Sequence, residues 1–302
     1  MSGIESVKDL VKPPFANYDI VVYFGCGLFS LPFIMHYMGR IRLKSTSFNF
    51  DVQPAFVSTL VTTLTVLFSV YILGHIIAYI GSQLIEKLMD SFFGKASTII
   101  LLGSKVKHDE LNGMIRGQLE KGVKKNFTRT TWLSGLVRCV SHIPAAPSYA
   151  AMFIFGVFGF YRTRVSDSVI AAADVKIRAI SPNHVGITPD AKWFKALEAI
   201  VMNNNPGASA RMYNYLVISG LFRSVCTILL ASMWFELAYF LSKLYGLDAP
   251  EGLLMVGNNN LEFQFLSYAS ISIVYMFSLF SYLKFQRRYV EDAIFAFVFT
   301  KG

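Results

Sequence analysis

Residues 52–85, VQPAFVSTLVTTLTVLFSVYILGHIIAYIGSQLI, form a run of 34 positions without Asp, Glu, Lys or Arg. A helix that spans a bilayer needs about 20 mainly apolar residues, so this run is long enough to cross one. We expect its helical part to extend from about Ala55 to Leu84. At ~1.5 Å per residue, such a helix exceeds a ~30 Å hydrocarbon core and must tilt or project beyond it. The run therefore indicates an integral membrane protein.

Three further apolar runs lie at residues 20–38, 213–241 and 263–283. Only 16% of the 302 residues are charged, 54% are hydrophobic and the mean hydropathy is +0.47. Soluble domains carry roughly 25% charged residues, so this composition argues against an ordinary soluble enzyme. We predict a mainly α membrane protein: a four-helix transmembrane bundle, arranged two and two around an inserted domain of roughly 125 residues.

The charge distribution predicts the orientation. Residues 86–211 contain 17 Lys and Arg against 9 Asp and Glu, which is nearly the whole net charge of +9. Because basic segments stay on the cytoplasmic side, we expect this domain and both termini to be cytosolic, in a plasma or inner membrane. The basic residues of loop 39–54 fit the external side of this arrangement badly. The predicted parts are a cytosolic lead (1–19), two transmembrane pairs (20–85 and 212–283), the basic domain (86–211) and a juxtamembrane tail (284–302).

The fold of the central domain is less constrained. Partial alternation of apolar residues around Val175, Ile177 and Ala179, and again at Val185 and Ile187, favours a mixed α/β domain. Residues 139–161 carry no formal charge, and three interpretations stay open for them: a buried helix of the domain, an interfacial or re-entrant piece, or a fifth span.

Polar side chains within the spans are candidate functional residues. On the second span they follow steps of four, four, three and four, and therefore share one helix face. These residues are Tyr71, His75, Tyr79, Ser82 and Glu86. A stripe of small residues beside them, Gly74, Ala78 and Gly81, predicts close approach of another helix.

The third span contains two ionisable residues, Arg223 and Glu236. A carboxylate in the membrane costs at least ~2.5 kcal/mol by insertion scales, so we expect Glu236 to have a partner. If Arg223 and Glu86 mark the inner interface, Glu236 and His75 lie at similar depths and form a proton- or ion-responsive pair. Alternatively, Glu236 lies near the outer headgroups and His75 bonds a Ser or Tyr in a static core.

Hydroxyl groups cluster on two spans. Their spacing places them on helix faces, where hydroxyls commonly pack between helices and can also line a wet pathway. They are Ser58, Thr62, Thr65 and Ser69 on the second span, and Ser267, Ser270, Ser278 and Ser281 on the fourth.

A basic patch near the membrane predicts contact with the anionic inner leaflet or with another phosphate. It consists of Lys105, Lys107, Arg116, Lys121, Lys124, Lys125, Arg129, Lys284, Arg287 and Arg288. Few aromatic residues are interleaved with these charges, so nucleic acid is a poor fit. A homo-oligomer and a cytosolic protein or small-ligand partner are further expectations.

No catalytic motif, metal spacing or cofactor fingerprint is present in the sequence, so we expect no catalytic residue, metal or cofactor. The favoured function is a non-enzymatic membrane protein whose cytosolic domain senses a ligand, lipid or partner and whose helices oligomerise into a pore or gated assembly. A lipid- or headgroup-processing enzyme with its site at the inner interface is the alternative. A proton-coupled transporter acting as a dimer is the third interpretation.

Overall fold

The computed structural model describes two compact units of the chain. Unit 1 comprises residues 1–83 and 220–279, and unit 2 comprises residues 84–219 and 280–302. Within them, the structure describes residues 18–43, 55–93, 96–97, 100, 147–148, 151, 154, 165–180, 191–244, 253–255 and 261–299. The basic segment 105–129 and most of the uncharged segment 139–161 lie outside these residues, as do Val185 and Ile187.

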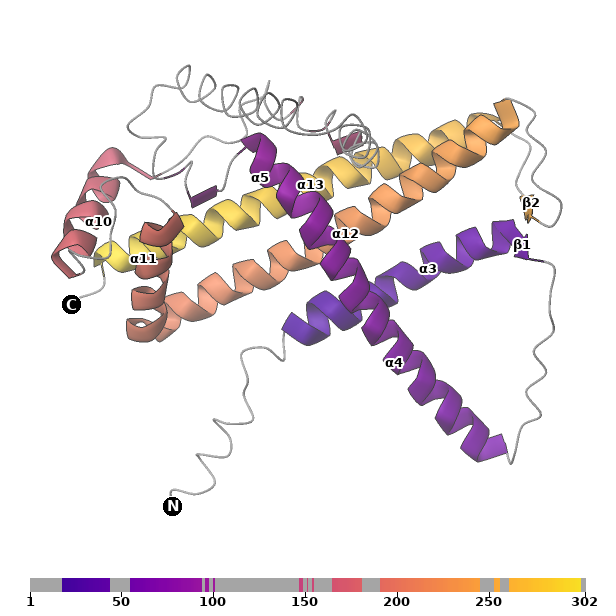
Figure 1. Ribbon diagram of the computed structural model, residues 1–302, viewed down its shortest axis with the longest axis horizontal. Helices are drawn as coiled ribbons and strands as arrows, with labels where there is room; N and C mark the ends of the chain where they lie inside the picture. The colour runs from indigo at the N-terminus through magenta and orange to yellow at the C-terminus, as the bar shows by residue number, and fades with distance from the viewer. Residues whose placement is uncertain are drawn as a thin grey trace, which may run out of the picture. The chain divides into compact units, whose positions relative to one another are not determined.

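Apart from two short strands and the residues Val165, Ser166 and Asn205, the described residues are helical (Figure 1). Four of the described helical stretches are long and apolar enough to cross a membrane, which confirms the prediction of a mainly α, multi-pass membrane protein. They are Asp19–Tyr37, Thr59–Asp90, Pro206–Leu241 and Phe265–Phe299.

The helices of unit 1 come from both halves of the chain. A π-helical turn, η1 (Asp19–Phe24), leads into α3 (Gly25–Arg40), and α4 (Ala55–Gly81) follows. The unit is completed by the later part of α12 (Pro206–Leu244) and the earlier part of α13 (Leu261–Phe299). Helix α4 begins at Ala55, the residue predicted for the start of the helical part of the second run.

Backbone contact joins η1 and α3 to α4, and these helices cross in Figure 1. A Cβ added to Gly27 would lie 2.0 Å from the carbonyl oxygen of Val70, and one added to Gly74 would lie 1.7 Å from that of Tyr23. Only glycine permits such an approach at either helix. The small-residue stripe on the second span is thereby confirmed as a surface of close helix contact.

The same unit contains a two-stranded antiparallel sheet. Strand β1 (Ile41–Leu43) follows α3 directly, and β2 (Leu253–Met255) lies between α12 and α13. Ile41 is opposite Met255 and Leu43 is opposite Leu253. The pairing brings the C-terminal end of α3 next to the α12–α13 connection.

Two helices of the second half are longer than the apolar runs predicted. The third begins at Pro206 rather than at Tyr213, because proline suits the first helical position and the Asn205 side chain accepts a hydrogen bond from the Ala208 amide at 3.0 Å. The fourth continues past Leu283 to Phe299. Its charged stretch does not end the helix, because Glu291 bridges Arg287 and Arg288 within one turn.

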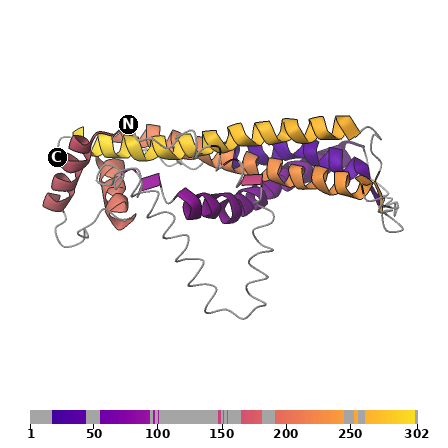
Figure 2. The ribbon, with the colours of Figure 1, turned by 90° about the horizontal axis from the view of Figure 1, so that it is seen from above.

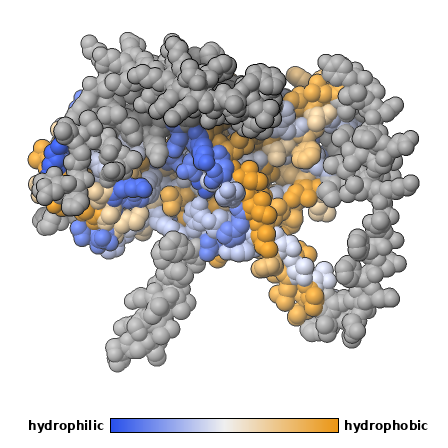
Figure 3. Space-filling view, in the orientation of Figure 1, coloured by the Kyte–Doolittle hydropathy of each residue, from blue (hydrophilic) through white to orange (hydrophobic). Residues whose placement is uncertain are grey.

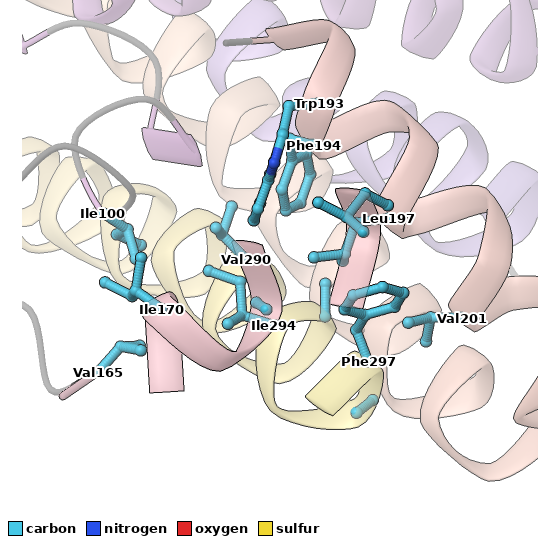
Figure 4. Packing of buried hydrophobic residues seen from close by; sticks show 14 of the residues in the cluster. Ile100, Val165, Ile170, Trp193, Phe194, Leu197, Val201, Val290, Ile294 and Phe297 are labelled. Atoms are coloured by element: carbon cyan, nitrogen blue, oxygen red, sulfur yellow. The ribbon is translucent and has the colours of Figure 1, made fainter. Parts of the chain in front are cut away.

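Unit 2 has a hydrophobic core between short helices and the ends of the two long ones (Figure 4). The η2 turn (Ser82–Glu86), which begins at the boundary with unit 1, continues into α5 (Lys87–Phe93). Helices α10 (Asp167–Ile180) and α11 (Ala191–Asn204) contribute Ile170, Trp193 and Leu197 to the core, and α13 contributes Ile294 and Phe297. In Figures 1 and 2 the first part of α12 and the last part of α13 run side by side, joined by an Arg211–Asp292 ion pair at 3.2 Å.

Residues 167–180 form a helix, so the prediction of strand structure around Val175, Ile177 and Ala179 is wrong. The buried residues Ile170, Ala173 and Ile177 repeat at helical spacing, and Val175 is 71% exposed. The apparent alternation was too short to outweigh that face.

Candidate functional site

The carboxylate of Glu236 is the centre of a polar site inside unit 1. Glu236 is only 2% exposed. It lies within Pro206–Leu241, the stretch of α12 that is long and apolar enough to cross a membrane. The Tyr37 hydroxyl of α3 lies 3.3 Å from Glu236 Oε1 and 3.3 Å from the carbonyl oxygen of Ser232. The phenol therefore donates its hydrogen between two acceptors one turn apart on α12 and fixes α3 against that turn.

Aromatic packing holds Tyr37 in this position. Its ring stacks on Phe235 with centroids 5.0 Å apart and planes inclined by 21°. The ring of His36 meets it edge-on at 5.2 Å. With its ring stacked on Phe235 and contacted by His36, and with only 8% of the residue exposed, Tyr37 presents its hydroxyl to Glu236 in a defined geometry.

A pocket of about 270 Å³ lies beside this pair. Helix α3 supplies Pro32, Phe33, His36 and Tyr37, α12 supplies Glu236, and α13 supplies Ser267 and Ile271. The lining thus combines one acidic group and a few polar donors with aromatic and aliphatic surface. Ionisable groups at membrane depth are costly and usually serve a function, which makes this pocket the principal candidate site.

The partnership of His75 with Glu236 that one interpretation of the sequence implied is not formed. The His75 ring stacks on Tyr23 with centroids 3.7 Å apart, and Tyr71 meets it edge-on at 4.5 Å. Tyr23 and Tyr37 are 14 residues apart along the η1–α3 helix, or about 20 Å at the helical rise. His75 and Glu236 therefore face different levels of the unit, and the depth estimate that paired them was wrong.

A second group of polar aromatic side chains surrounds His75. Tyr18 extends it, packing edge-on against Tyr23 at 5.4 Å. Arg223 of α12 lies close to Gly81 of α4, where an added Cβ would be 3.4 Å from the arginine side chain. Helix α12 thus carries a basic residue, Arg223, beside α4, and an acidic residue, Glu236, 13 positions later in the sequence.

The remaining predicted residues of the second span are not brought together. Tyr79 is 67% exposed, and Ser82 donates to the Tyr79 carbonyl oxygen at 2.8 Å. Glu86 instead lines a pocket of about 200 Å³ in unit 2. Its other polar lining residues are Asp90, Ser97, Ser219, Gln286 and Tyr289. The predicted stripe of Tyr, His, Ser and Glu is therefore divided among separate environments.

The hydroxyl faces differ between the two spans. Thr62, Thr65 and Ser69 are exposed, and the Thr65 hydroxyl donates to its own helix at the Val61 carbonyl oxygen. The side chain of Ser58 lies outside the described part. On α13, Ser278 is buried, Ser267 and Ser281 are half-buried and Ser270 is exposed. Of these residues, Ser267 reaches the Glu236 pocket.

The basic residues of α13 take part in contacts within the chain. Arg287 and Arg288 each lie 3.5 Å from a carboxylate oxygen of Glu291, which is buried, while Lys284 is exposed. Nearby, the Tyr289 hydroxyl donates to Glu198 of α11. Two of the three predicted lipid-facing charges at this end of α13 thus have an acidic partner.

The sequence did not single out Tyr37, Phe235 or the Tyr289–Glu198 pair. Tyr37 could have been noticed, because it follows Phe33 by four residues at the end of the first span and so extends one aromatic face.

Within the described residues, no group of three or more His, Cys, Asp or Glu side chains is placed to hold a metal ion. No protein-family model, curated protein or solved structure matches this chain.

Proposed function

We propose that this chain is a multi-pass membrane protein whose helices self-associate into a gated assembly, with a basic central domain on the cytosolic side that senses a ligand, lipid or partner. The exposed hydroxyl-bearing half of α4 carries this proposal. The layout is two pairs of spanning helices around the central domain, with both termini cytosolic.

The exposed half of α4 is the observation that favours self-association. Every residue from Thr59 to Ser69 is exposed, and Figure 3 shows the apolar surface of this helix. In the most apolar 18-residue stretch of this span, only 17% of the residues are buried. In the corresponding stretch of α12, 61% are buried. Lipid can cover apolar side chains, but hydroxyl groups at membrane depth favour contact with another helix. A second copy would bring that contact to Thr62, Thr65 and Ser69.

Two observations support the pairing of the spans. The β1–β2 sheet joins the connection after α3 to the connection between α12 and α13, as expected if both loops leave the membrane on the same side. Tyr18 lies against Gly220, and Gly81 lies against Thr227, so the opposite ends of these helices also meet. The excess of basic residues in the central block supports its cytosolic location.

The test removes hydroxyl groups from one face of α4 while keeping side-chain shape. The full chain is reconstituted in lipid nanodiscs, and its copy number is measured by native mass spectrometry. Thr62→Val, Thr65→Val and Ser69→Ala together are expected to lower the copy number and to abolish conductance in a planar bilayer. Thr59→Val with Thr63→Val removes the same chemistry from a face turned by about 60–100°, and this control should assemble normally. A monomeric wild-type protein would overturn the proposal.

One observation favours a second candidate, the headgroup-processing enzyme. The unit 2 pocket places the carboxylates of Glu86 and Asp90, one turn apart, with the hydroxyls of Ser97, Ser219 and Tyr289. Carboxylates near hydroxyl groups can serve general acid–base chemistry. Turnover of a lipid headgroup by the wild type, lost in Glu86→Gln but retained in the triple variant Thr62→Val, Thr65→Val and Ser69→Ala, would favour this candidate over the assembly.

A further inference from the structure

We infer that α4 lies at the symmetry axis of the proposed assembly, where one face of the helix contacts the same face of α4 in a neighbouring copy. The inference rests on the proposed self-association. It goes further, because it names the helix at the axis and the residues that meet there. The partner is a second copy of this chain with the same orientation in the membrane.

The face in question runs along most of α4. In the part of the helix that packs within unit 1, residues 70–81, the exposed side chains all fall on one face. Steps of three and four residues continue this face back through the exposed first half of the helix. We call this face the α4 seam, and it consists of Thr62, Thr65, Ser69, Ile72, Ile76 and Tyr79. It is about 25 Å long at the helical rise, close to the ~30 Å thickness of the hydrocarbon core.

The α4 seam points away from the contacts that the helix makes in its own copy. The backbone of the first span approaches α4 at Val70 and Gly74. At 3.6 residues per turn, the centre of the seam lies about 150° around the helix from these two residues. Further along the seam, Ile72 and Ile76 are still 42% and 50% exposed. The described part of the chain therefore leaves the seam to lipid or to another copy.

The hydroxyl groups of the seam favour another copy over lipid. The Thr65 hydroxyl donates to the Val61 carbonyl oxygen of its own helix at 2.8 Å. Thr62 and Ser69 lie two turns apart, and neither hydroxyl has a hydrogen-bond partner within the part of the chain that the structure describes. Lipid tails offer no such partner, whereas a second helix can supply one.

The chemistry of the seam suits contact with itself. A hydroxyl group both donates and accepts, so a threonine or serine can bond to its own counterpart. No charged residue lies between positions 52 and 85, so no repulsion between like charges opposes the contact. The exposed faces of α3 and α13 in unit 1 include Phe29, Met35, Phe265 and Phe277, whose side chains offer a hydroxyl group no strong hydrogen bond.

The membrane sets the register of this contact. Copies inserted with the same orientation are related by an axis along the membrane normal, so their α4 helices are parallel and equivalent residues lie at the same depth. Thr62 and Ser69 then meet their own counterparts, and Ile72 and Ile76 meet theirs. Steps of three and four residues are also those of the contact seam between parallel helices.

A cysteine scan of residues 59–69 tests the inference. All these residues are exposed in a single copy, so exposure alone predicts equal reactivity along the scan. Each is replaced in turn in the full chain, the membranes of the expressing cells are oxidised with copper phenanthroline, and non-reducing electrophoresis measures the linked dimer. Two Cα atoms must come within about 7 Å to form a disulfide. We therefore expect Thr62→Cys and Ser69→Cys to yield at least fivefold more dimer than Thr63→Cys.

Thr63→Cys is the matched control, because it replaces another exposed threonine on the side of the helix that carries Val70 and Gly74. The chain without an added cysteine measures the background from its own three cysteines. Equal yields at all scanned positions would indicate random collision and overturn the inference. A link from Thr62→Cys to a native cysteine, located by peptide mass spectrometry, would overturn it as well.

The packed half of α4 gives a second measurement. Ile72→Cys and Ile76→Cys should also form the dimer, because the seam continues through them. If only the first half formed links, the helices would diverge and the parallel seam would be wrong. The copy number from native mass spectrometry separates the two proposals. An oligomer without seam links would overturn this inference alone, whereas a monomer would overturn the proposed self-association as well.

Discussion

Gly74 of α4 touches the backbone of Tyr23: a Cβ added to the glycine would lie 1.7 Å from the tyrosine carbonyl oxygen. The same tyrosine stacks its ring on His75, the next residue of α4. Backbone contact and ring stacking therefore act at one point of the crossing between η1 and α4. The exact position of the glycine decides whether the aromatic cluster can form.

Replacing Gly74 by alanine should force the two helices apart. A Cβ clash with backbone cannot be relieved by a side-chain rotation, so the helices must shift and the Tyr23–His75 stacking should be lost. We expect a decrease in thermal stability of the detergent-solubilised protein and altered near-ultraviolet circular dichroism. Gly25→Ala is the control, because its Cβ would lie 3.5 Å from the Ile20 carbonyl oxygen, an ordinary contact. Equal melting temperatures for both variants would contradict the crossing.

The Asn205 side chain should set the beginning of α12. Its Oδ1 accepts from the Ala208 amide at 3.0 Å, directly before the helix starts at Pro206. Asn205→Ala is expected to cost roughly 0.5–2 kcal/mol and to speed hydrogen exchange of the amides in the first turn. Asn204→Ala, one residue earlier at an exposed position, should leave these exchange rates unchanged. Protected first-turn amides in Asn205→Ala would show that another contact holds this end.

Glu291 should contribute more to stability than its neighbour Asp292. The Glu291 side chain is 3% exposed and bridges Arg287 and Arg288, which are 15% and 36% exposed. Removing one partner of a buried ion pair costs about 3–5 kcal/mol, and the partial exposure of Arg288 places Glu291→Ala at the lower end. The free energy of unfolding in mixed micelles measures this loss.

Asp292→Ala is the natural comparison for that experiment. The Arg211 side chain that pairs with Asp292 is 60% exposed, and exposed ion pairs contribute about 0–1 kcal/mol. A loss in Asp292→Ala as large as that in Glu291→Ala would mean that burial does not set the difference between the two pairs.

Much of the helical architecture could be predicted from the sequence, because length and the absence of charge identify a spanning helix. The start of α4 at Ala55 is an example. The helix ends were predicted less well when capping and charge pairing, rather than hydropathy, decided them. Thus α12 begins early at Pro206, and α13 continues through its arginines because Glu291 pairs with them.

The partners of the candidate site were harder to predict. Glu236 stands out in any apolar run, but its partner Tyr37 is 199 positions away and depends on how α3 meets α12. Depth counted along single helices paired Glu236 with His75, since that count ignores which neighbouring helix each residue faces. Helix packing, rather than the composition of either span, decides between the two partners.

The β1–β2 sheet has a consequence for the order in which the protein is made. Strand β1 ends at Leu43 and β2 begins at Leu253, so about 210 residues separate them. At a synthesis rate of about 5–20 residues per second, β2 is synthesised roughly 10–40 s after β1. Pairing of these strands is therefore a late event that cannot guide the first two helices. The glycine contacts between α3 and α4 are already available to a nascent chain of fewer than half of its residues.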